Sequence, residues 1–228
     1  MTSLTFNAWS RERTGRLARD GMQDGRASGS VAVTLEGTDA TGAPTSTQSG
    51  NVAFLLAGPP DAIGLRPGAI TDRYPAPGTP DAESDKCPYV ELALPQLPWT
   101  YSPDGNPDTT SGDLRAWLAL VVGIEGDELT LAAGKVALTP ALQQDYVLSH
   151  PTTRWAHEQV DEAGRRTGRV VSGRALDAGV EYVAALVPAF TAAGAPAWTG
   201  AAPVTLAAFD VWRFQTSVIP GSFRDLAA

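Results

Sequence analysis

The sequence predicts an all-β fold, sandwich- or barrel-like, with about nine or ten strands, one or two short helices and long loops rich in proline and glycine. Three observations predict it. The chain holds 23 glycines and 18 prolines in 228 residues, more turn formers than average proteins carry. Charged residues make up 18%, too few for a coiled coil or a charged helical bundle. Hydrophobic residues make up 43%, enough for a core, and they occur in short runs.

The first quarter of the chain alternates between predicted strands and loops. Residues 4–9 predict a short strand or extended arm, and residues 10–30 predict a polar loop. Residues 30–36 place Val31, Val33 and Leu35 on one face, which predicts a half-buried strand. Residues 38–50 are almost all Thr, Ser, Gly, Ala and Pro, which predicts a surface loop. The apolar run over 51–57 predicts a strand buried on both faces.

The middle of the chain predicts a proline-rich connection followed by three strands. Several prolines within 74–88 exclude a central strand, because proline cannot donate to a sheet ladder. Residues 89–94 alternate and predict a strand. The apolar run 114–122 predicts another strand, and a turn at Gly126 predicts that it pairs with 128–131 as a hairpin.

The last third predicts one short helix and three further strands. Thr139 as N-cap and Pro140 at the first helical position predict a helix over 139–145. The expected strands are 155–160, 180–188 and 204–216. We expect one β-rich domain over 1–228, with a division into two lobes near 139–152 as the alternative.

The net charge, the cysteine content and the absence of targeting signals limit the classes of protein that the sequence can represent. A net charge of −8 with scattered cations argues against nucleic acid as a partner. The charged N-terminus does not fit a signal peptide, and no apolar run is long enough for a membrane span, so we expect a protein folded in the cytoplasm. The single cysteine, Cys87, excludes an intrachain disulfide and is expected to be a small buried or half-buried residue.

The sequence carries no recognisable catalytic or cofactor motif. His150 and His157 are the two histidines, and both are expected to be structural or surface residues. The segment that starts at His157 lacks the second histidine of the zinc-protease motif. There is no Gly-X-Ser-X-Gly elbow, phosphate loop or dinucleotide fingerprint. We therefore expect no enzyme activity, no cofactor and no metal; a hydrolase with a loop-built site is kept as an alternative.

Aromatic residues beside proline and glycine loops are the candidate interface residues. Trp117 and Trp212 lie within apolar strands and are expected to be buried. Aromatic side chains near loops or a terminus can instead anchor a partner protein. The candidates of this kind are Trp9, Trp99, Tyr101 and Trp198.

A series of short aromatic and proline-containing motifs occurs in order along the chain. These motifs are Phe6-Asn-Ala-Trp9, Phe54-Leu-Leu-Ala-Gly-Pro59, Asp61-Ala-Ile-Gly-Leu65, Tyr89-Val-Glu-Leu92, Leu97-Pro-Trp-Thr-Tyr-Ser-Pro103, Leu114 to Val122, Trp155-Ala-His157, Tyr182 to Phe190, Trp212-Arg-Phe-Gln-Thr216 and Gly221-Ser-Phe223. This series resembles a family of structural proteins encoded with phage-tail-like contractile injection systems, in which a sheath surrounds a tube on a baseplate.

The resemblance implies a non-enzymatic component of such a particle, in its baseplate, tip or fibre-adaptor region. It also implies contacts with baseplate, tube or sheath proteins, and a homo-oligomer within the assembly. The alternative reading from the residues is a carbohydrate- or receptor-binding β-sandwich that uses exposed tryptophans.

Overall fold

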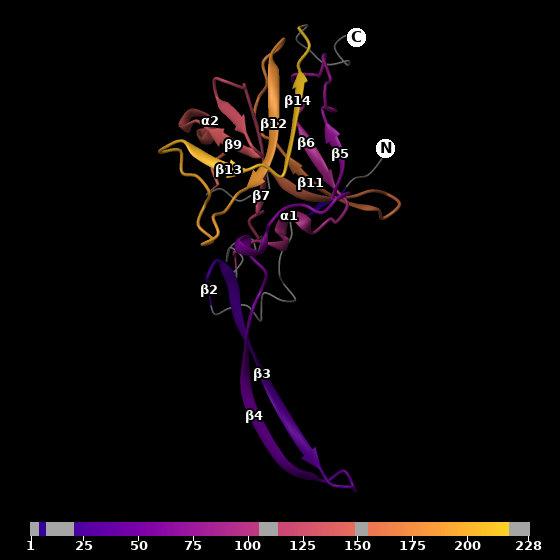
Figure 1. Ribbon diagram of the computed structural model, residues 1–228. Coiled ribbons are helices and arrows are strands. Elements are labelled where there is room, and N and C mark those ends of the chain that lie inside the picture. The colour runs from indigo at the N-terminus through magenta and orange to yellow at the C-terminus, as the bar shows by residue number, and fades with distance from the viewer. Residues whose placement is uncertain (1–4, 8–20, 105–113, 149–154, 219–228) are drawn as a thin grey trace.

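The fold is β-rich and built from antiparallel sheets, as the sequence predicts (Figure 1). The computed structural model describes residues 5–7, 21–104, 114–148 and 155–218. Over these residues the chain forms fourteen strands and two short α-helices, more strands than expected, and none of the sheets closes into a barrel. The strands form a body, from which one long hairpin projects.

The largest sheet of the body has five strands, every neighbouring pair antiparallel. Its order is β1 (Thr5–Asn7), β10 (Ala156–Val160), β11 (Arg166–Val171), β6 (Tyr89–Leu92) and β5 (Ile70–Tyr74). Strands distant in sequence are therefore neighbours, and the N-terminal β1 completes one edge by pairing with β10.

Two three-stranded sheets complete the body. The first has the order β14 (Asp210–Gln215), β12 (Glu181–Pro188) and β7 (Leu118–Gly123). The second has the order β13 (Val204–Ala207), β9 (Lys135–Leu138) and β8 (Leu129–Ala132). Every residue of β7 is buried, as are six of the eight residues of β12, because both strands are near-continuous apolar runs.

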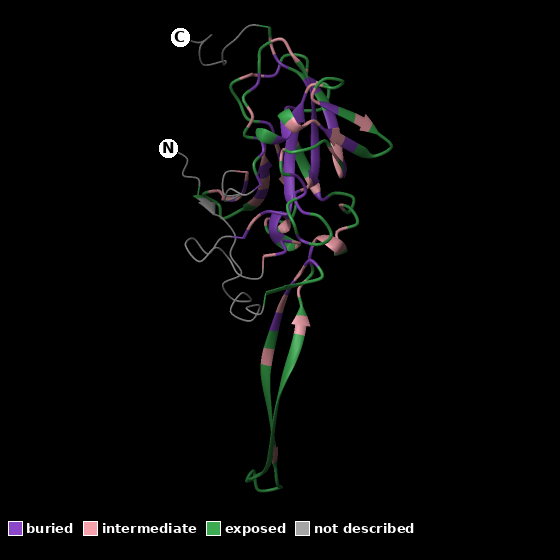
Figure 2. Ribbon diagram, turned by 90° about the vertical axis from the view of Figure 1, so that its left-hand side faces the viewer, coloured by how far each residue is buried: buried purple, intermediate pink, exposed green. Residues whose placement is uncertain are grey.

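One hydrophobic cluster joins the three sheets of the body (Figure 2). Val90 and Val170 come from the five-stranded sheet, Leu120 and Leu186 from the second sheet, and Val136 from the third. Each of these five residues has no exposed surface. Buried residues on both sides of 139–152 belong to this cluster, while the single-domain expectation stays a prediction.

Both helices are short and begin with proline near their first position. α1 (Leu97–Thr100) carries Pro98, and α2 (Pro140–Gln144) starts at Pro140. The Thr139 hydroxyl accepts a hydrogen bond from the Leu142 amide at 3.3 Å, so the predicted N-cap of α2 is confirmed. A 3₁₀ turn, η1 (Pro59–Asp61), lies at the foot of the projecting hairpin.

The projecting hairpin consists of β3 (Arg26–Thr38) and β4 (Pro44–Leu55), with β2 (Gly21–Gln23) paired to the first residues of β3. The predicted strand over 30–36 is confirmed as part of β3, but its expected half-burial is wrong, because every residue of this segment except Val31 is exposed. The predicted loops over 10–30 and 38–50 are confirmed only at the turns 24–25 and 39–43; β2, β3 and β4 occupy the other described residues of both segments. Threonine and serine in 44–50 are compatible with an exposed strand, which explains the error.

Two further predictions are corrected by long-range pairing. β7 and β8 do not form a hairpin, since β7 pairs with β12 and β8 pairs with β9. The single strand predicted over 204–216 is two strands, because the chain leaves β13 after Ala207 and enters β14 in another sheet. Local apolar patterns do not distinguish one long strand from two strands in different sheets.

Candidate protein–protein interface

The projecting hairpin is the most exposed element that the structure describes. β3 has 13 residues and β4 has 12, so the ribbon is about 40 Å long. Figure 2 shows it exposed along nearly its whole length, whereas the body strands β7 and β12 are almost entirely buried. The prediction that 51–57 is buried on both faces is therefore wrong: most of its residues are exposed.

The hairpin is anchored firmly where it leaves the body. The Arg26 guanidinium binds the Asp61 carboxylate through two hydrogen bonds, Nε–Oδ2 at 2.8 Å and Nη2–Oδ1 at 2.6 Å. This contact lowers the pKa of Asp61 to about 2, with a smaller contribution from the Gly58 amide. The Leu56 amide also donates to the carbonyl oxygen of Ala27 at 2.8 Å, and Ala27 is fully buried.

Gly25 allows this close approach to the body. Its φ is +72°, in the left-handed region. A Cβ at this position would lie 2.1 Å from the carbonyl oxygen of Ala192, a backbone atom. No other residue type fits without a backbone shift, so the root of the hairpin is a fixed point on the body.

One face of the ribbon is apolar and the other polar. Residues directly opposite each other in an antiparallel pair share a face, and the register places Val31 opposite Val52 and Thr34 opposite Ser49. The apolar face carries Val31, Val33, Leu35, Val52 and Phe54, together with Gly29, Gly50 and Gln48, the last opposite Leu35. The polar face consists of Ser30, Thr34, Glu36, Thr47, Ser49 and Asn51, with Ala32 and Ala53 among them.

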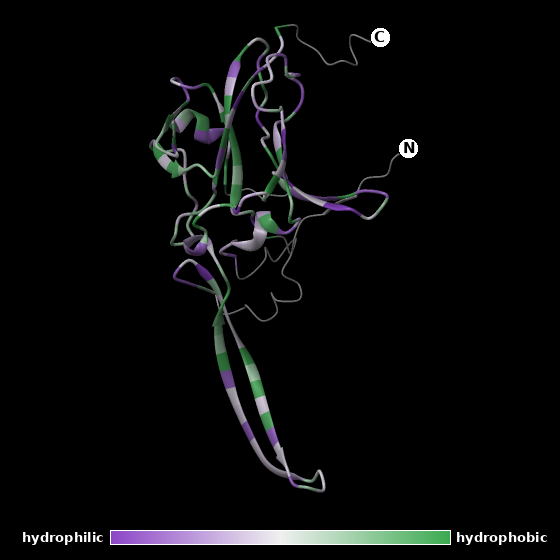
Figure 3. Ribbon diagram, turned by 45° about the vertical axis from the view of Figure 1, so that its right-hand side comes forward, coloured by the Kyte–Doolittle hydropathy of each residue, from purple (hydrophilic) through white to green (hydrophobic). Residues whose placement is uncertain are grey.

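The apolar face is open to solvent in the described structure. Leu35 is 65% exposed, Val52 57% and Val33 37%. Figure 3 shows hydrophobic segments on both strands of the ribbon, interspersed with hydrophilic ones. A two-stranded ribbon needs a further strand or a packed surface on its hydrophobic face to be independently stable. An uncovered apolar face is therefore a candidate contact surface for another protein.

The distal turn of the hairpin is closed by one aspartate. The Asp39 carboxylate accepts hydrogen bonds from the Thr41 hydroxyl at 2.6 Å, the Thr41 amide at 2.8 Å and the Ala43 amide at 3.0 Å. These contacts, led by the Thr41 hydroxyl, lower the pKa of Asp39. Between Arg26 and Leu55 the charged residues are Glu36 and Asp39, and the sequence of β4 contains none.

Two of the four predicted interface residues lie in the core. Trp99 is 3% exposed and Trp198 5%, and both belong to the hydrophobic cluster. The Trp198 indole donates to the carbonyl oxygen of Tyr146 at 2.7 Å, a buried bond. A partner would find almost no exposed ring at either position, so we correct the expectation that these two indoles present a surface.

Of the other two predicted interface residues, the structure describes Tyr101 but not Trp9. Tyr101 is half-buried and packs edge-on against Trp117, with ring centroids 4.9 Å apart. Trp9 lies outside the described residues. Tyr101 and Trp99 lie at α1, whereas Trp198 lies beside α2, so the structure does not bring the candidates into one patch. Trp117 and Trp212 are buried, as predicted.

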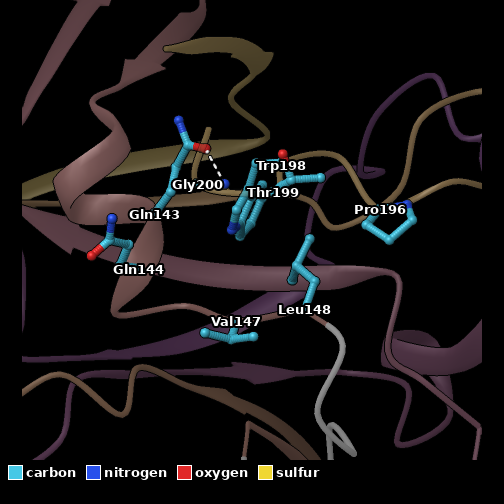
Figure 4. Close-up of a pocket in the computed structure, with 8 residues that line it drawn as sticks. All are labelled: Gln143, Gln144, Val147, Leu148, Pro196, Trp198, Thr199 and Gly200. Atoms are coloured by element: carbon cyan, nitrogen blue, oxygen red, sulfur yellow. Dashed lines mark hydrogen bonds between the residues drawn. The ribbon is translucent and has the colours of Figure 1, made fainter. Parts of the chain in front are cut away.

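The pocket beside Trp198 is built from structural contacts (Figure 4). It has a volume of about 250 Å³ and is lined mainly by apolar surface. Its buried amide, on Gln143, donates to the carbonyl oxygens of Leu138 at 3.1 Å and Ala202 at 2.8 Å. The amide oxygen accepts from the Gly200 backbone at 3.0 Å. Because its donors and its acceptor hold backbone groups, this amide has a clear role in fixing the loop.

The titratable residues singled out from the sequence are dispersed. His157 is half-buried in β10, and burial, followed by the charge of Arg169, lowers its pKa. His150 lies outside the described residues. Cys87 is exposed, so the expectation of a buried or half-buried thiol is wrong. In the part of the chain that the structure describes, no three His, Cys, Asp or Glu side chains gather closely enough to hold a metal ion.

Comparisons with known proteins add no further constraint. No family model, no curated protein and no solved structure matches the chain. None of the described helices has the length and apolar character needed to cross a bilayer. We therefore infer function from the geometry of the hairpin and the body.

Proposed function

We propose that the chain is a non-enzymatic structural component of a phage-tail-like contractile injection particle, held in the assembly through its projecting hairpin. The observation that carries the proposal is the apolar face of the ribbon, on which Val33, Leu35 and Val52 are exposed and Val31 and Phe54 are half-buried. A large apolar face on an arm extending from the body fits a subunit whose arm lies against a neighbour. The type of particle is inferred from the series of aromatic and proline-containing motifs described above, which resembles a family encoded with such systems.

Charge and anchoring support an arm that docks rather than a flexible loop. The Arg26–Asp61 contact and the tight packing at Gly25 hold the root of the hairpin against the body. Beyond Arg26 the ribbon carries two acidic residues and no cation. Such a surface is suited to hydrophobic and backbone contacts with protein and not to a polyanion.

The presence of the chain in particles is tested by mass spectrometry. Particles sedimented from the native cell are expected to contain this chain together with sheath and tube proteins. Sedimented particles that contain the sheath and tube proteins and lack this chain would refute the particle assignment.

The role of the apolar face is tested with matched variants. We expect Val33→Ser with Leu35→Ser to lower incorporation about tenfold or more, since each buried aliphatic side chain contributes roughly 1.5–3 kcal/mol. The control is Thr34→Ser with Glu36→Gln on the polar face of the same strand. Both variants should keep the thermal midpoint of the free chain, because these residues are exposed. Equal incorporation of the two would contradict docking through the apolar face.

A further inference from the structure

The outer edge of β4 is a long unprotected strand edge. Among the described residues β4 is hydrogen-bonded to β3 on one side, and β3 also carries β2 at its first residues. Alternate residues of an edge strand present both N–H and C=O groups outward. Proteins protect such edges with charges, prolines, bulges or very short strands. β4 has 12 residues and no charged residue; its one proline, Pro44, and the register shift of the pair at Gly37 and Thr38 both lie at the distal end and leave the rest of the edge regular.

We propose that the β4 edge pairs antiparallel with the β4 edge of a second copy of this chain, forming a four-stranded sheet in the order β3-β4-β4-β3. This inference rests on the proposed function in that it names the partner of the same hairpin. It concerns the edge of the ribbon, whereas the apolar face remains available to another particle subunit.

Charge permits a second copy at this edge. Each chain carries a net charge of −8, so two copies repel each other wherever acidic surfaces meet. Pairing along β4 places no charged side chain of one β4 opposite a charged side chain of the other, because the strand has none. Glu36 lies on β3, one strand further from the junction.

The shape of the molecule permits the pairing. The hairpin extends away from the body, so antiparallel pairing places the two bodies at opposite ends of a shared ribbon (Figures 1 and 2). The two-fold axis lies perpendicular to the sheet, which puts both apolar faces on the same side. The pair therefore doubles the apolar surface formed by residues such as Leu35 and Val52.

The expected pairing is weak in dilute solution. An edge about 40 Å long and about 10 Å thick buries roughly 400 Å² on each copy. Stable complexes bury about 800 Å² on each partner. We therefore expect reversible self-association that a covalent trap can capture.

The symmetry predicts at which residue a disulfide crosslink between the two copies forms most readily. A two-fold axis between identical antiparallel strands passes beside one residue, which faces its own copy. Pairing over the greatest length places the axis beside Ser49 or Gly50. Facing Cα atoms are about 4.5–5.5 Å apart, within disulfide range. Two residues from the axis, a position and its own copy are separated by about 14 Å.

The experiment is a cysteine scan on the full chain. The background is Cys87→Ser, because the native thiol is exposed. Single cysteines replace Thr47, Ser49, Gly50 or Asn51, and the control is Thr34→Cys on β3, directly opposite Ser49. A Cβ at Gly50 meets no atom within 4 Å, and the Ser49 and Thr34 variants lose the same hydroxyl contact, 3.1 Å long.

We expect disulfide dimers to peak at Ser49→Cys or Gly50→Cys under mild oxidation, at least about tenfold above Thr34→Cys, whose copies lie three strand spacings apart. For an axis at Ser49, mixing the Thr47→Cys and Asn51→Cys proteins should give crosslinked heterodimers. The pairing would be overturned if the cysteines on β4 gave no more disulfide dimer than Thr34→Cys on β3. It would also be overturned if every β4 position gave the same yield of disulfide dimer. Because the purified chain is used alone, failure here is distinguishable from absence of the chain from particles.

Discussion

Tyr146 illustrates how single residues join the sheets of the body. Its hydroxyl accepts from the Val122 amide at 2.9 Å, lies 3.2 Å from the Val122 carbonyl oxygen and 2.8 Å from the Ser172 hydroxyl. The side chain is fully buried, and burial raises its pKa to about 12. The Tyr146 phenol thus joins β7, a strand of the β14-β12-β7 sheet, to the segment that follows β11.

We expect Tyr146→Phe to lower the free energy of unfolding by about 1–3 kcal/mol, because it leaves buried backbone and hydroxyl groups unsatisfied. Urea denaturation measures the change. The control is Tyr101→Phe, whose hydroxyl makes no hydrogen bond to the described residues and should change stability by less than about 0.5 kcal/mol. Equal effects would contradict the structural role of the Tyr146 hydroxyl.

The same phenol predicts a pH dependence. Its pKa is near 10 in the unfolded chain and about 12 in the fold, so the native state holds this proton more tightly. The stabilisation is fully present below pH 10 and is lost as pH rises through 12. The stability difference between the native chain and Tyr146→Phe should therefore shrink over this range in urea titrations. A stability difference between the two proteins that grows with pH would contradict the raised pKa of Tyr146.

At the scale of elements, α2 depends on its N-cap. Thr139→Ala removes the hydroxyl that accepts from the Leu142 amide and should cost about 1 kcal/mol of unfolding free energy. Thr139→Ser keeps the acceptor and should retain most of the stability. Chemical denaturation of both variants checks this, and equal losses would show that the methyl group matters more than the cap.

The hairpin is an element that the body does not need. No residue of β3 or β4 belongs to the described hydrophobic cluster. We expect replacement of residues 30–53 by a short glycine-containing turn to shift the thermal midpoint by no more than about 4 °C. Calorimetry measures the shift. Cooperative unfolding at a much lower temperature would show that the ribbon supports the body.

Some elements could be predicted from the sequence because their signals are local. β6 and β12 follow apolar patterns, and α2 follows its threonine cap and proline. The hairpin could not be predicted in this way. β4 combines an apolar end with a Ser/Thr-rich half, and its pairing with β3 is set by register across the Asp39 turn. The nearly matched strand lengths around that turn were the available signal.

The candidate site escaped prediction for a related reason. Aromatic residues beside proline loops suggest an interface, yet Trp99 and Trp198 find space in the core. Exposure depends on what the rest of the fold covers, which local composition does not encode. The apolar alternation at Val31, Val33 and Leu35 was visible in the sequence, but its lack of cover in the described structure was not.

At the scale of the whole molecule, a packed body carries an arm with an apolar face and an open edge. The body contains one hydrophobic cluster spanning three sheets, and the arm exposes apolar side chains. In the association that we propose, the net charge of −8 opposes docking of the ribbon little, since Glu36 and Asp39 are the only acidic residues between Arg26 and Leu55.

Hydrogen exchange of the hairpin tests the central claim most directly. Amides over 29–55 are compared by mass spectrometry in the free chain and in the sedimented particle. We expect rapid exchange in the free chain and strong protection in the particle, with the body strands β7 and β12 protected in both. Equal, rapid exchange of the hairpin in both states would contradict its role as the arm that holds the chain in the assembly.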